Sequence, residues 1–458
     1  MRPDGAPNRP PKPAARAGRV GLWRYMRLFR QDILSAQPAR LYRAWMAEFR
    51  TPFFRSFLCN DPALVRLVLQ KRPEDFPKSA RIGEGLAPLL GRSVFVTNGE
   101  TWARQRRIID PAFEGGRLRE SHAAMWAAGQ AAVARMPEGE VEIEAQASHV
   151  AADVIFRTLF SIPIEDETAA RVFAAFRAHQ LSQPILNLAA LLPLPGWLPR
   201  PYRRATRGTA REIRSLIAQL TANRMAQIRA GTAPADLATK IMTTPDPLTG
   251  RCFDTGEMAD QVAIFFLAGH ETSAAALAWA LLMLALHPDV QARVAAEAVA
   301  LSDDFSSVSG LKLTRSVLRE TLRLYPPVPM MVREAAGPEQ FRDRTVPRGA
   351  QIVLSPWHLH RHERLWPDPD AFDPERWMDG RAAEPARAAY IPFSAGPRVC
   401  PGAGFAMAEG VLLLGLLVRA FQFAPVAGPL PVPQAHLTVR ARDGIRLSVV
   451  RRQGTDAA

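Results

Sequence analysis

A cysteine within a short, glycine-containing loop constrains this chain more than any other feature of its sequence. Cys400 follows Arg398 by two residues in the stretch FSAGPRVCPG, which spans residues 393–402. Two glycines free the backbone here, and such a turn can point N–H groups at a sulfur and hold it as a thiolate. Because a free cysteine has a pKa of about 8.5, a thiolate at neutral pH needs this kind of help or a bound metal ion. The stretch therefore indicates a metal–thiolate site, and the alternative is an ordinary buried cysteine in a loop.

The chain is long enough for a large continuous core. It has 458 residues, of which 48% are hydrophobic, and no long linker interrupts it. Residues 1–20 are rich in proline and arginine and lack the apolar segment of a signal peptide, so we expect a disordered leader before a single domain over residues 21–458. The three cysteines, Cys59, Cys252 and Cys400, cannot supply a disulfide framework, which favours a reducing compartment.

The charge balance of the chain is strongly basic. With 58 basic and 44 acidic residues, the net charge is +14, which would attract nucleic acid, anionic lipid or an acidic protein. The sequence has no zinc-finger or helix-turn-helix motif, so we expect no nucleic-acid partner.

We find no window of about 20 apolar residues that would span a membrane. The longest apolar run, Val411–Val418, is interrupted by glycine, so we expect a cytoplasmic protein. Residues 21–30, GLWRYMRLFR, interleave aromatic and basic side chains and could rest on an anionic membrane surface as a peripheral contact. A helix that packs on the body with a solvated basic side explains the same pattern, and the sequence does not decide between the two.

Apolar residues recur with helical spacing over most of the chain. Near the N-terminus, Asp61 is expected to cap a helix that begins at Pro62 and runs to about Gln70. The longest predicted helix ends before Pro288, because the residue that precedes a proline disfavours helix. Long helices are expected at Ser121–Ala134, Ala147–Leu159, Arg211–Arg229, Glu257–Leu286 and Asp289–Leu301.

Strand-like segments are few and predict small sheets beside the helices. Two are short, Arg55–Leu58 and Gln351–Leu354, and the longer alternating segment Leu437–Val450 is expected to form a hairpin around the turn signal Asp443-Gly444. The apolar, proline-rich connection Leu181–Pro201 would suit a substrate entrance. The expected fold class is therefore mainly α with small β-sheets.

The longest predicted helix contains the motif AGHETS, residues 268–273. A glycine inside a helix costs roughly 1 kcal/mol relative to alanine, so Gly269 calls for a reason. Together with Ala268 it would let a large group approach the helix, and Thr272 falls on the same face one turn later. The alternative is a buried helix with a chance glycine.

Two further spacings place pairs of side chains together on helices. Glu320 and Arg323 carry opposite charges three residues apart, an arrangement that is common on protein surfaces and worth about 0.3–0.5 kcal/mol there. Trp102 and Arg106, four residues apart, share a helix face. Neither pair is specific by itself.

Taken together, these motifs resemble those of the cytochrome P-450 superfamily, the haem-thiolate monooxygenases, and the soluble bacterial type among them. The cysteine stretch fits F-x-x-G-x-R-x-C-x-G at every fixed position, and the other motifs resemble the family's oxygen-activation helix, E-x-x-R pair and W-x-x-x-R helix. The resemblance spans about residues 50–450 and keeps the family's order. It implies a triangular helical prism with haem between the long central helix and the cysteine-ligand loop.

The resemblance also implies a role for each motif. Cys400 would be the axial ligand of the iron of haem b, Thr272 would steady dioxygen, and Glu271 would feed protons for O–O cleavage. A structural triad is expected of Glu320, Arg323 and Arg376. The further residues expected to contact the haem are Phe393, Gly396, Arg398, Gly402, Ala268, Gly269, Trp102, Arg106 and Arg333.

The implied activity is insertion of one atom of O2 into a hydrophobic substrate, by hydroxylation or epoxidation. No flavin or ferredoxin domain fits in the remaining sequence, so we expect the electrons of NAD(P)H to arrive through a ferredoxin or flavodoxin with its reductase, and we expect a monomer. An apolar pocket indicates a fatty acid, a terpenoid or another lipid-like substrate. The residues expected to line it are Leu89, Leu90, Phe265, Val328, Met330, Met331 and Leu437.

Three alternatives stay open. A peroxygenase on the same fold would use hydrogen peroxide directly, and the acid–alcohol pair Glu271 and Thr272 argues against it. A haem-binding sensor or carrier would need no such pair. His358, His360 and His362 would share one face of a strand as zinc ligands do, but no cysteine lies nearby, so we expect ordinary packing or surface histidines.

Overall fold

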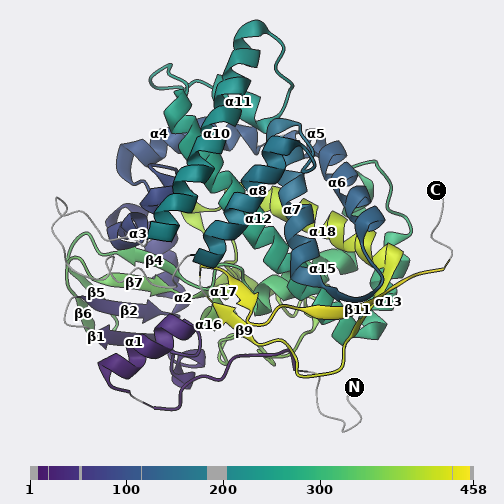
Figure 1. The fold of residues 1–458 in the computed structure, drawn as a ribbon. Helices are drawn as coiled ribbons and strands as arrows, with labels where there is room; N and C mark the ends of the chain where they lie inside the picture. The colour runs from purple at the N-terminus through teal and green to yellow at the C-terminus, as the bar shows by residue number, and fades with distance from the viewer. Residues whose placement is uncertain are drawn as a thin grey trace.

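The longest helix, α12 (Thr255–Leu286), passes through the middle of the molecule, as Figure 1 shows for the computed structural model of the chain. The structure describes residues 9–18, 20–50, 54–114, 116–182, 204–435 and 437–453. Helix α12 begins at a capping box, in which the side chains of Asp254 and Glu257 each accept the backbone N–H of the other residue. It ends where His287 precedes Pro288, because that position disfavours helical dihedral angles.

The other long helices pack around α12 through their apolar faces. Those in direct contact with it include α7 (Ile143–Phe160), α10 (Arg204–Ala230), α15 (Lys312–Leu324) and α18 (Ala403–Ala420). The further helices are α1 (Leu22–Gln31), α2 (Pro62–Arg66), α3 (Ala80–Leu90), α4 (Gly99–Ile109), α5 (Arg117–Glu120), α6 (His122–Arg135), α8 (Glu167–Ser182), α11 (Leu237–Thr243), α13 (Pro288–Ala298), α14 (Ser307–Gly310), α16 (Pro356–Leu359) and α17 (Ala383–Ala389).

The strands form small sheets beside the helices, at the lower edge of Figure 1. The largest sheet has the order β1 (Met46–Arg50), β2 (Arg55–Cys59), β7 (Gln351–Leu354) and β4 (Met331–Glu334), and its β2–β7 pair is parallel. A second sheet has the order β3 (Gly139–Glu142), β11 (Arg446–Arg451) and β8 (Phe421–Pro425). The two pairs are β5 (Glu339–Phe341) with β6 (Arg344–Val346) and β9 (Pro433–Ala435) with β10 (Val439–Ala441).

Most elements expected from the sequence are present, and the fold is mainly α with small β-sheets, as predicted. The five long helices lie where apolar periodicity placed them, with ends that differ by a few residues. Asp61 caps α2 by accepting the N–H of Ala63 at 2.9 Å, and a π-helical segment, Leu67–Lys71, continues the helix. The hairpin expected within residues 437–450 is wrong. Gly444 turns the chain with a φ of +77°, but β10 pairs with β9, whereas β11 pairs with β3 and β8.

The described part of the N-terminal segment, residues 9–18, contacts the body of the protein. Lys12 Nζ lies 2.8 Å from Asp370 Oδ2 and 3.8 Å from the centre of the Tyr42 ring. The hydroxyl of Tyr325 donates a hydrogen bond to the carbonyl of Pro11 at 2.7 Å. Described residues of this segment are therefore bound to the body of the protein. The predicted entrance loop, residues 181–201, lies outside the described residues from 183 onward.

Two helices, α12 and α18, are long and apolar enough to cross a membrane by length and composition alone. The sequence had led us to expect none. More than half of the most apolar window of each helix is buried inside the fold, which is also the position of an ordinary core helix. The finding is therefore weak evidence for a membrane span.

Candidate active site

The loop before Cys400 is held in one conformation by its own backbone and by a neighbouring helix. The N–H of Cys400 donates to the carbonyl of Phe393 at 2.9 Å, and that of Val399 donates to the carbonyl of Gly396 at 3.0 Å. Gly396 has a φ of +69°, and a Cβ atom there would lie 1.9 Å from the carbonyl oxygen of Leu69. Only glycine fits this position. The loop is thereby locked just before α18 begins.

The Cys400 side chain has exposed surface although protein surrounds it closely. Burial raises the pKa of its thiol, while a hydrogen bond from the Gly402 backbone and the charge of Arg106 act in the opposite direction. Because the residue is exposed while its sulfur is desolvated, we infer that the sulfur borders a space enclosed by protein.

One face of α12 also borders an interior space. Ala268 is exposed, although Phe266 and Leu267 beside it are buried. Thr272, one turn later, is partly exposed, and its Oγ1 donates to the carbonyl of Ala268 at 2.5 Å. The exposed stripe follows the spacing that the sequence predicted for these two residues.

Gly269 also lies against another helix. A Cβ atom at this position would lie 2.4 Å from Cδ1 of Ile155 on α7. The glycine therefore allows α7 to pack closely against α12, and the exposed stripe is formed by its neighbour Ala268. This close helix packing accounts for the cost of a glycine in mid-helix.

The carboxylate of Glu271 is buried and anchored to the C-terminal part of the chain. Thr438 Oγ1 donates to Glu271 Oε1 at 2.6 Å, and Arg440 Nε lies 3.4 Å from the same oxygen. The adjacent His270 bonds through Nε2 to Ser148 Oγ at 2.7 Å, and burial lowers the pKa of this histidine to about 3. Glu271 is therefore adjacent to Thr272 in the sequence, but its carboxylate contacts Thr438 and Arg440 instead of Thr272.

A second carboxyl group, which we did not predict, lies behind the same helix. Ser273 Oγ donates to Glu409 Oε2 on α18 at 2.8 Å, which ties α12 to α18. Burial raises the pKa of Glu409 to about 8, and its Oε1 has no hydrogen-bond partner among the described residues. In the sequence, Glu409 could have been noticed as an acidic residue within the apolar segment that forms α18.

Basic side chains gather beside the cysteine loop. The guanidinium of Arg398 lies 4.3 Å from the centre of the Trp102 ring, and its Nη1 is buried without a partner in the described structure. Arg106 donates from Nη1 to the carbonyl of Val399 at 2.7 Å and from Nε to Asp110 at 2.6 Å. The pair predicted from spacing, Trp102 and Arg106, therefore does adjoin the cysteine loop.

Lys78 is a further member of this group, and no sequence motif pointed to it. Its backbone pairs with that of Arg333, and its Nζ donates to the carbonyl of Val94 at 2.5 Å. Burial, and then the charges of Arg398, Arg333 and Arg106, hold the pKa of Lys78 well below its usual value. Burial and Arg398 also lower the pKa of Arg333 to about 10. We call Lys78, Arg106, Arg333 and Arg398 the cation cluster.

The expected structural triad is assembled and fully buried. Glu320 accepts two hydrogen bonds from Arg323, at 2.8 and 2.9 Å, and one from Arg376 at 3.0 Å. Trp377 Nε1 and the N–H of Asp373 donate to the same carboxylate at 2.9 and 3.0 Å. The remaining N–H groups of Arg323 bond to backbone carbonyls of the 360–371 segment. We call Glu320, Arg323 and Arg376 the brace, because it joins α15 to a later loop.

The histidine triplet lies in and after the short helix α16, not on a strand. All three histidines are buried. His358 bonds through Nδ1 to Ser355 Oγ at 2.8 Å, and His360 accepts the N–H of Ile391 through Nε2 at 2.9 Å. No group of three or more His, Cys, Asp or Glu side chains in the described ranges could hold a metal ion. These histidines are packing residues, as expected.

The residues expected to line a substrate pocket divide into two sets. Leu89 and Leu90 are 2% and 0% exposed within the core, so they offer no surface to a ligand and do not fit the expectation. The others keep partial exposure in this structure. They are Phe265, Val328, Met330, Met331 and Leu437.

The sequence matches the family model of cytochrome P450 over residues 46–449. The chain belongs to the cytochrome P450 family. One relative, cyclooctat-9-en-7-ol 5-monooxygenase of Streptomyces melanosporofaciens, is 34% identical over 393 residues, which cover 84% of this chain and 83% of that protein. Cyclooctatin synthase of the same organism is 30% identical over 397 residues, 83% of this chain and 84% of that protein. Human cytochrome P450 4A11 is 28% identical over 414 residues, 85% and 79% of the two chains.

The chain is therefore a cytochrome P450 oxidoreductase, and its family implies haem, O2 and electrons that originate from NAD(P)H. The residues present fit a haem on two observations. Cys400 is exposed although its sulfur is desolvated by protein, and a thiolate at this position can bind iron. The cation cluster gathers four like charges, of which Arg333 is buried and the others are half-buried, and it leaves Arg398 Nη1 without a partner among the described residues, as a site for an anionic group would.

Proposed function

We propose that Cys400 binds the iron of haem b and that this cytochrome P450 hydroxylates or epoxidises a hydrophobic, lipid-like substrate with electrons from separate redox proteins. The observation that carries the proposal is the exposure of Cys400 and Ala268 inside the fold. We infer that both border one cavity, because α18, which follows the cysteine loop, packs against α12.

The residues that would hold the haem follow from the charges. Its two propionates would pair with the cation cluster, and the Trp102 ring supports the guanidinium of Arg398. The small side chain of Ala268 leaves room beside α12, while Phe393, Gly396 and Gly402 shape the loop that presents Cys400. When bound, the haem iron supplies the centre at which dioxygen is reduced and activated, and the thiolate ligand promotes O–O cleavage.

Thr272 and Glu271 would take part in proton transfer in this cavity. The Thr272 hydroxyl now donates to Ala268 in its own helix, and by rotation it can donate instead to an oxygen atom in the cavity. The Glu271 carboxylate is held by Thr438 and Arg440, so proton delivery requires release of these contacts or a water molecule between the two groups.

The net charge of +14 favours an acidic electron donor, and we propose a ferredoxin or flavodoxin with its reductase. We further propose a cytoplasmic monomer without a nucleic-acid partner. For the substrate, the names of the two Streptomyces relatives favour an alicyclic, terpenoid-like alcohol or hydrocarbon over a fatty acid. The partly exposed Met330 and Met331 would give such a pocket pliable walls.

The test of the haem ligand is the CO spectrum of the reduced protein. We expect a thiolate-type spectrum that is lost in Cys400→Ser and kept in Cys252→Ser, a matched change at an exposed cysteine. A thiolate-type spectrum in Cys400→Ser, or none in the unaltered protein, would overturn the assignment.

Turnover separates the rival activities. We expect product from a cyclic terpenoid alcohol with NAD(P)H, O2, a ferredoxin and its reductase, and a shift of the ferric Soret band on binding of that alcohol. Thr272→Val should consume NAD(P)H with less product per electron pair, because it lacks the hydroxyl. Turnover with hydrogen peroxide alone would identify a peroxygenase, and a haem protein that converts no substrate would be a sensor or carrier.

A further inference from the structure

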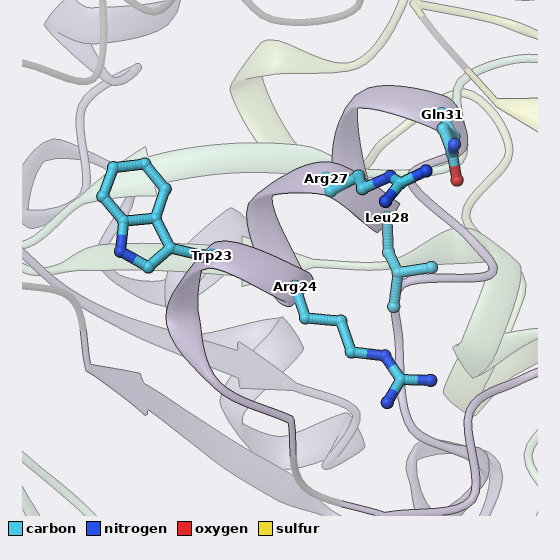
Figure 2. A pocket seen from close by; sticks show the side chains of 5 residues that line it. All are labelled: Trp23, Arg24, Arg27, Leu28 and Gln31. Atoms are coloured by element: carbon cyan, nitrogen blue, oxygen red, sulfur yellow. The ribbon is translucent and has the colours of Figure 1, made fainter.

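The outer face of α1 carries an exposed tryptophan among arginines. Trp23 is 84% exposed, and no large hydrophobic side chain in the described ranges is more exposed. Arg24, Arg27 and Arg30 are exposed on the same helix, whose sequence LWRYMRLFRQ contains no acidic residue. Figure 2 shows Trp23 extended away from the helix, and a hollow of about 450 Å³ lies between Trp23, Arg24, Arg27, Leu28 and Gln31.

The attachment of α1 to the body does not use this face. The Tyr25 ring stacks on Phe49 at 6.3 Å between centres, lies 5.7 Å from Phe29, and has the guanidinium of Arg16 at 5.8 Å. These contacts hold the inner face of the helix against the body of the protein. They agree with the interpretation of residues 21–30 as a helix that packs on the body. They give no reason for the exposure of Trp23, because a solvated basic face does not need a large apolar side chain.

The arginines of α1 are not balanced by nearby acids. In the described part of the chain, no ion pair involves Arg24, Arg27 or Arg30. The carboxylate of Asp32 is buried and accepts the N–H groups of Leu34, Ser35 and Ala435. The next acid, Glu48, pairs with two arginines of the adjoining strands. The face is therefore a free source of positive charge.

We propose that α1 docks this protein on the surface of an anionic lipid bilayer. Tryptophan has an apolar ring and one N–H donor and prefers the boundary between lipid tails and headgroups. Arginine binds phosphate groups bidentately, and both Arg24 and Arg27 line the hollow beside Trp23. A helix of this composition lies in the plane of the interface with its cations among the headgroups. The net charge of +14 adds long-range attraction.

This inference goes beyond the proposed function and does not depend on it. Vesicle binding is measured on the whole protein without turnover, so either can fail while the other holds. If both hold, the enzyme is concentrated where a lipid-like substrate dissolves.

The experiment is cosedimentation of the full-length protein with phosphatidylcholine vesicles and with vesicles that also contain phosphatidylglycerol. We expect binding to the anionic vesicles that weakens with added salt. Arg24→Gln/Arg27→Gln should lower the partition coefficient by about 30-fold, because each charge near an anionic surface contributes about fivefold. Trp23→Ala should lower it several-fold at every salt concentration, because the tryptophan contribution is not electrostatic.

The matched control is Arg229→Gln/Arg251→Gln. It removes the same charge from exposed residues near α10 and α11, at the far side of the molecule from α1 in Figure 1. We expect the control to bind like the unaltered protein. The proposal is overturned by absence of binding to anionic vesicles, by equal losses in the control and in the α1 variant, or by α1 variants that lose only binding to an acidic redox protein. The CO spectrum of each variant checks that its fold is intact.

Discussion

Two groups of charges in this protein, the buried brace and the partly buried cation cluster, are balanced in opposite ways. In the brace, one carboxylate, Glu320, receives two arginines, and its oxygens also accept an indole and a backbone N–H. In the cation cluster, Arg106 is the one member with an ion-pair partner among the described residues, namely Asp110. A closed network of charges specifies structure, whereas like charges left together specify a ligand of opposite charge.

The largest effect is expected from opening the brace. Glu320→Gln leaves Arg323 buried without a counter-charge and leaves Arg376 with Asp373 alone, 4.0 Å away. It should reduce the free energy of unfolding by about 3–5 kcal/mol, measured in urea. The matched control is Glu339→Gln, which breaks a salt bridge with Arg72 at the surface and should cost at most about 1 kcal/mol. Equal losses in the two variants would show that the brace is not a stabilising network.

The buried carboxyl group of Glu409 belongs to neither group, because its hydrogen-bond partner is the neutral side chain of Ser273. The raised pKa of Glu409 means that the folded protein keeps a proton that the unfolded chain loses above about pH 4.5. Its contribution to stability is therefore complete below that pH and is lost as the pH rises to about 8, with a span on the order of 5 kcal/mol. In urea unfolding from pH 5 to 8, Glu409→Gln should show a weaker fall in stability than the unaltered protein. Parallel curves would contradict the assignment.

Removal of a charge from the cation cluster should stabilise the haem-free protein, whereas removal of a charge from the brace should destabilise the protein. Lys78→Met removes one of the mutually repelling buried cations and should stabilise the haem-free protein, because the pKa of Lys78 is lowered by burial and like charges. The same change should weaken retention of haem by roughly 2 kcal/mol, about 30-fold, through loss of a charged hydrogen bond. Urea unfolding of the haem-free protein and haem transfer to an acceptor protein measure the two effects. A loss of stability in the haem-free variant would show that Lys78 is a structural residue.

The pH dependence of stability provides a second test of whether the charge of Lys78 destabilises the haem-free protein. Because the folded-state pKa of Lys78 lies below its unfolded value of about 10.5, the unfolded chain binds more protons between the two values. The stability of the haem-free protein should therefore rise with pH in that range as the repulsion is removed. Lys78→Met should flatten this rise.

The parts of the site that the sequence revealed are those with fixed local spacing. Cys400 and Arg398 lie in one loop, Glu320 and Arg323 lie one turn apart, and a helix repeat aligns Ala268 with Thr272. Such relationships are set by backbone geometry, so they can be read without a tertiary structure.

The parts that the sequence did not reveal depend on contacts between distant segments. Lys78 joins the cation cluster through its backbone pairing with Arg333, and Glu409 meets Ser273 only because α18 packs on α12. The reason for Gly269 lies in Ile155 of another helix. The turn at Gly444 was visible in the sequence, but the partners of the strands on either side were not.

The attachment of the N-terminal segment has a practical consequence for anyone who produces this enzyme. Lys12 reaches Asp370, and the carbonyl of the preceding Pro369 accepts a hydrogen bond from Arg323 of the brace. A chain shortened to begin at residue 20 would leave Asp370 with Arg361, 3.5 Å away, and would remove the carbonyl that Tyr325 uses. Deletion of this segment would therefore remove contacts of Lys12 and Pro11 that support the loop beside the brace. A purification tag should therefore be placed so that residues 9–18 are kept.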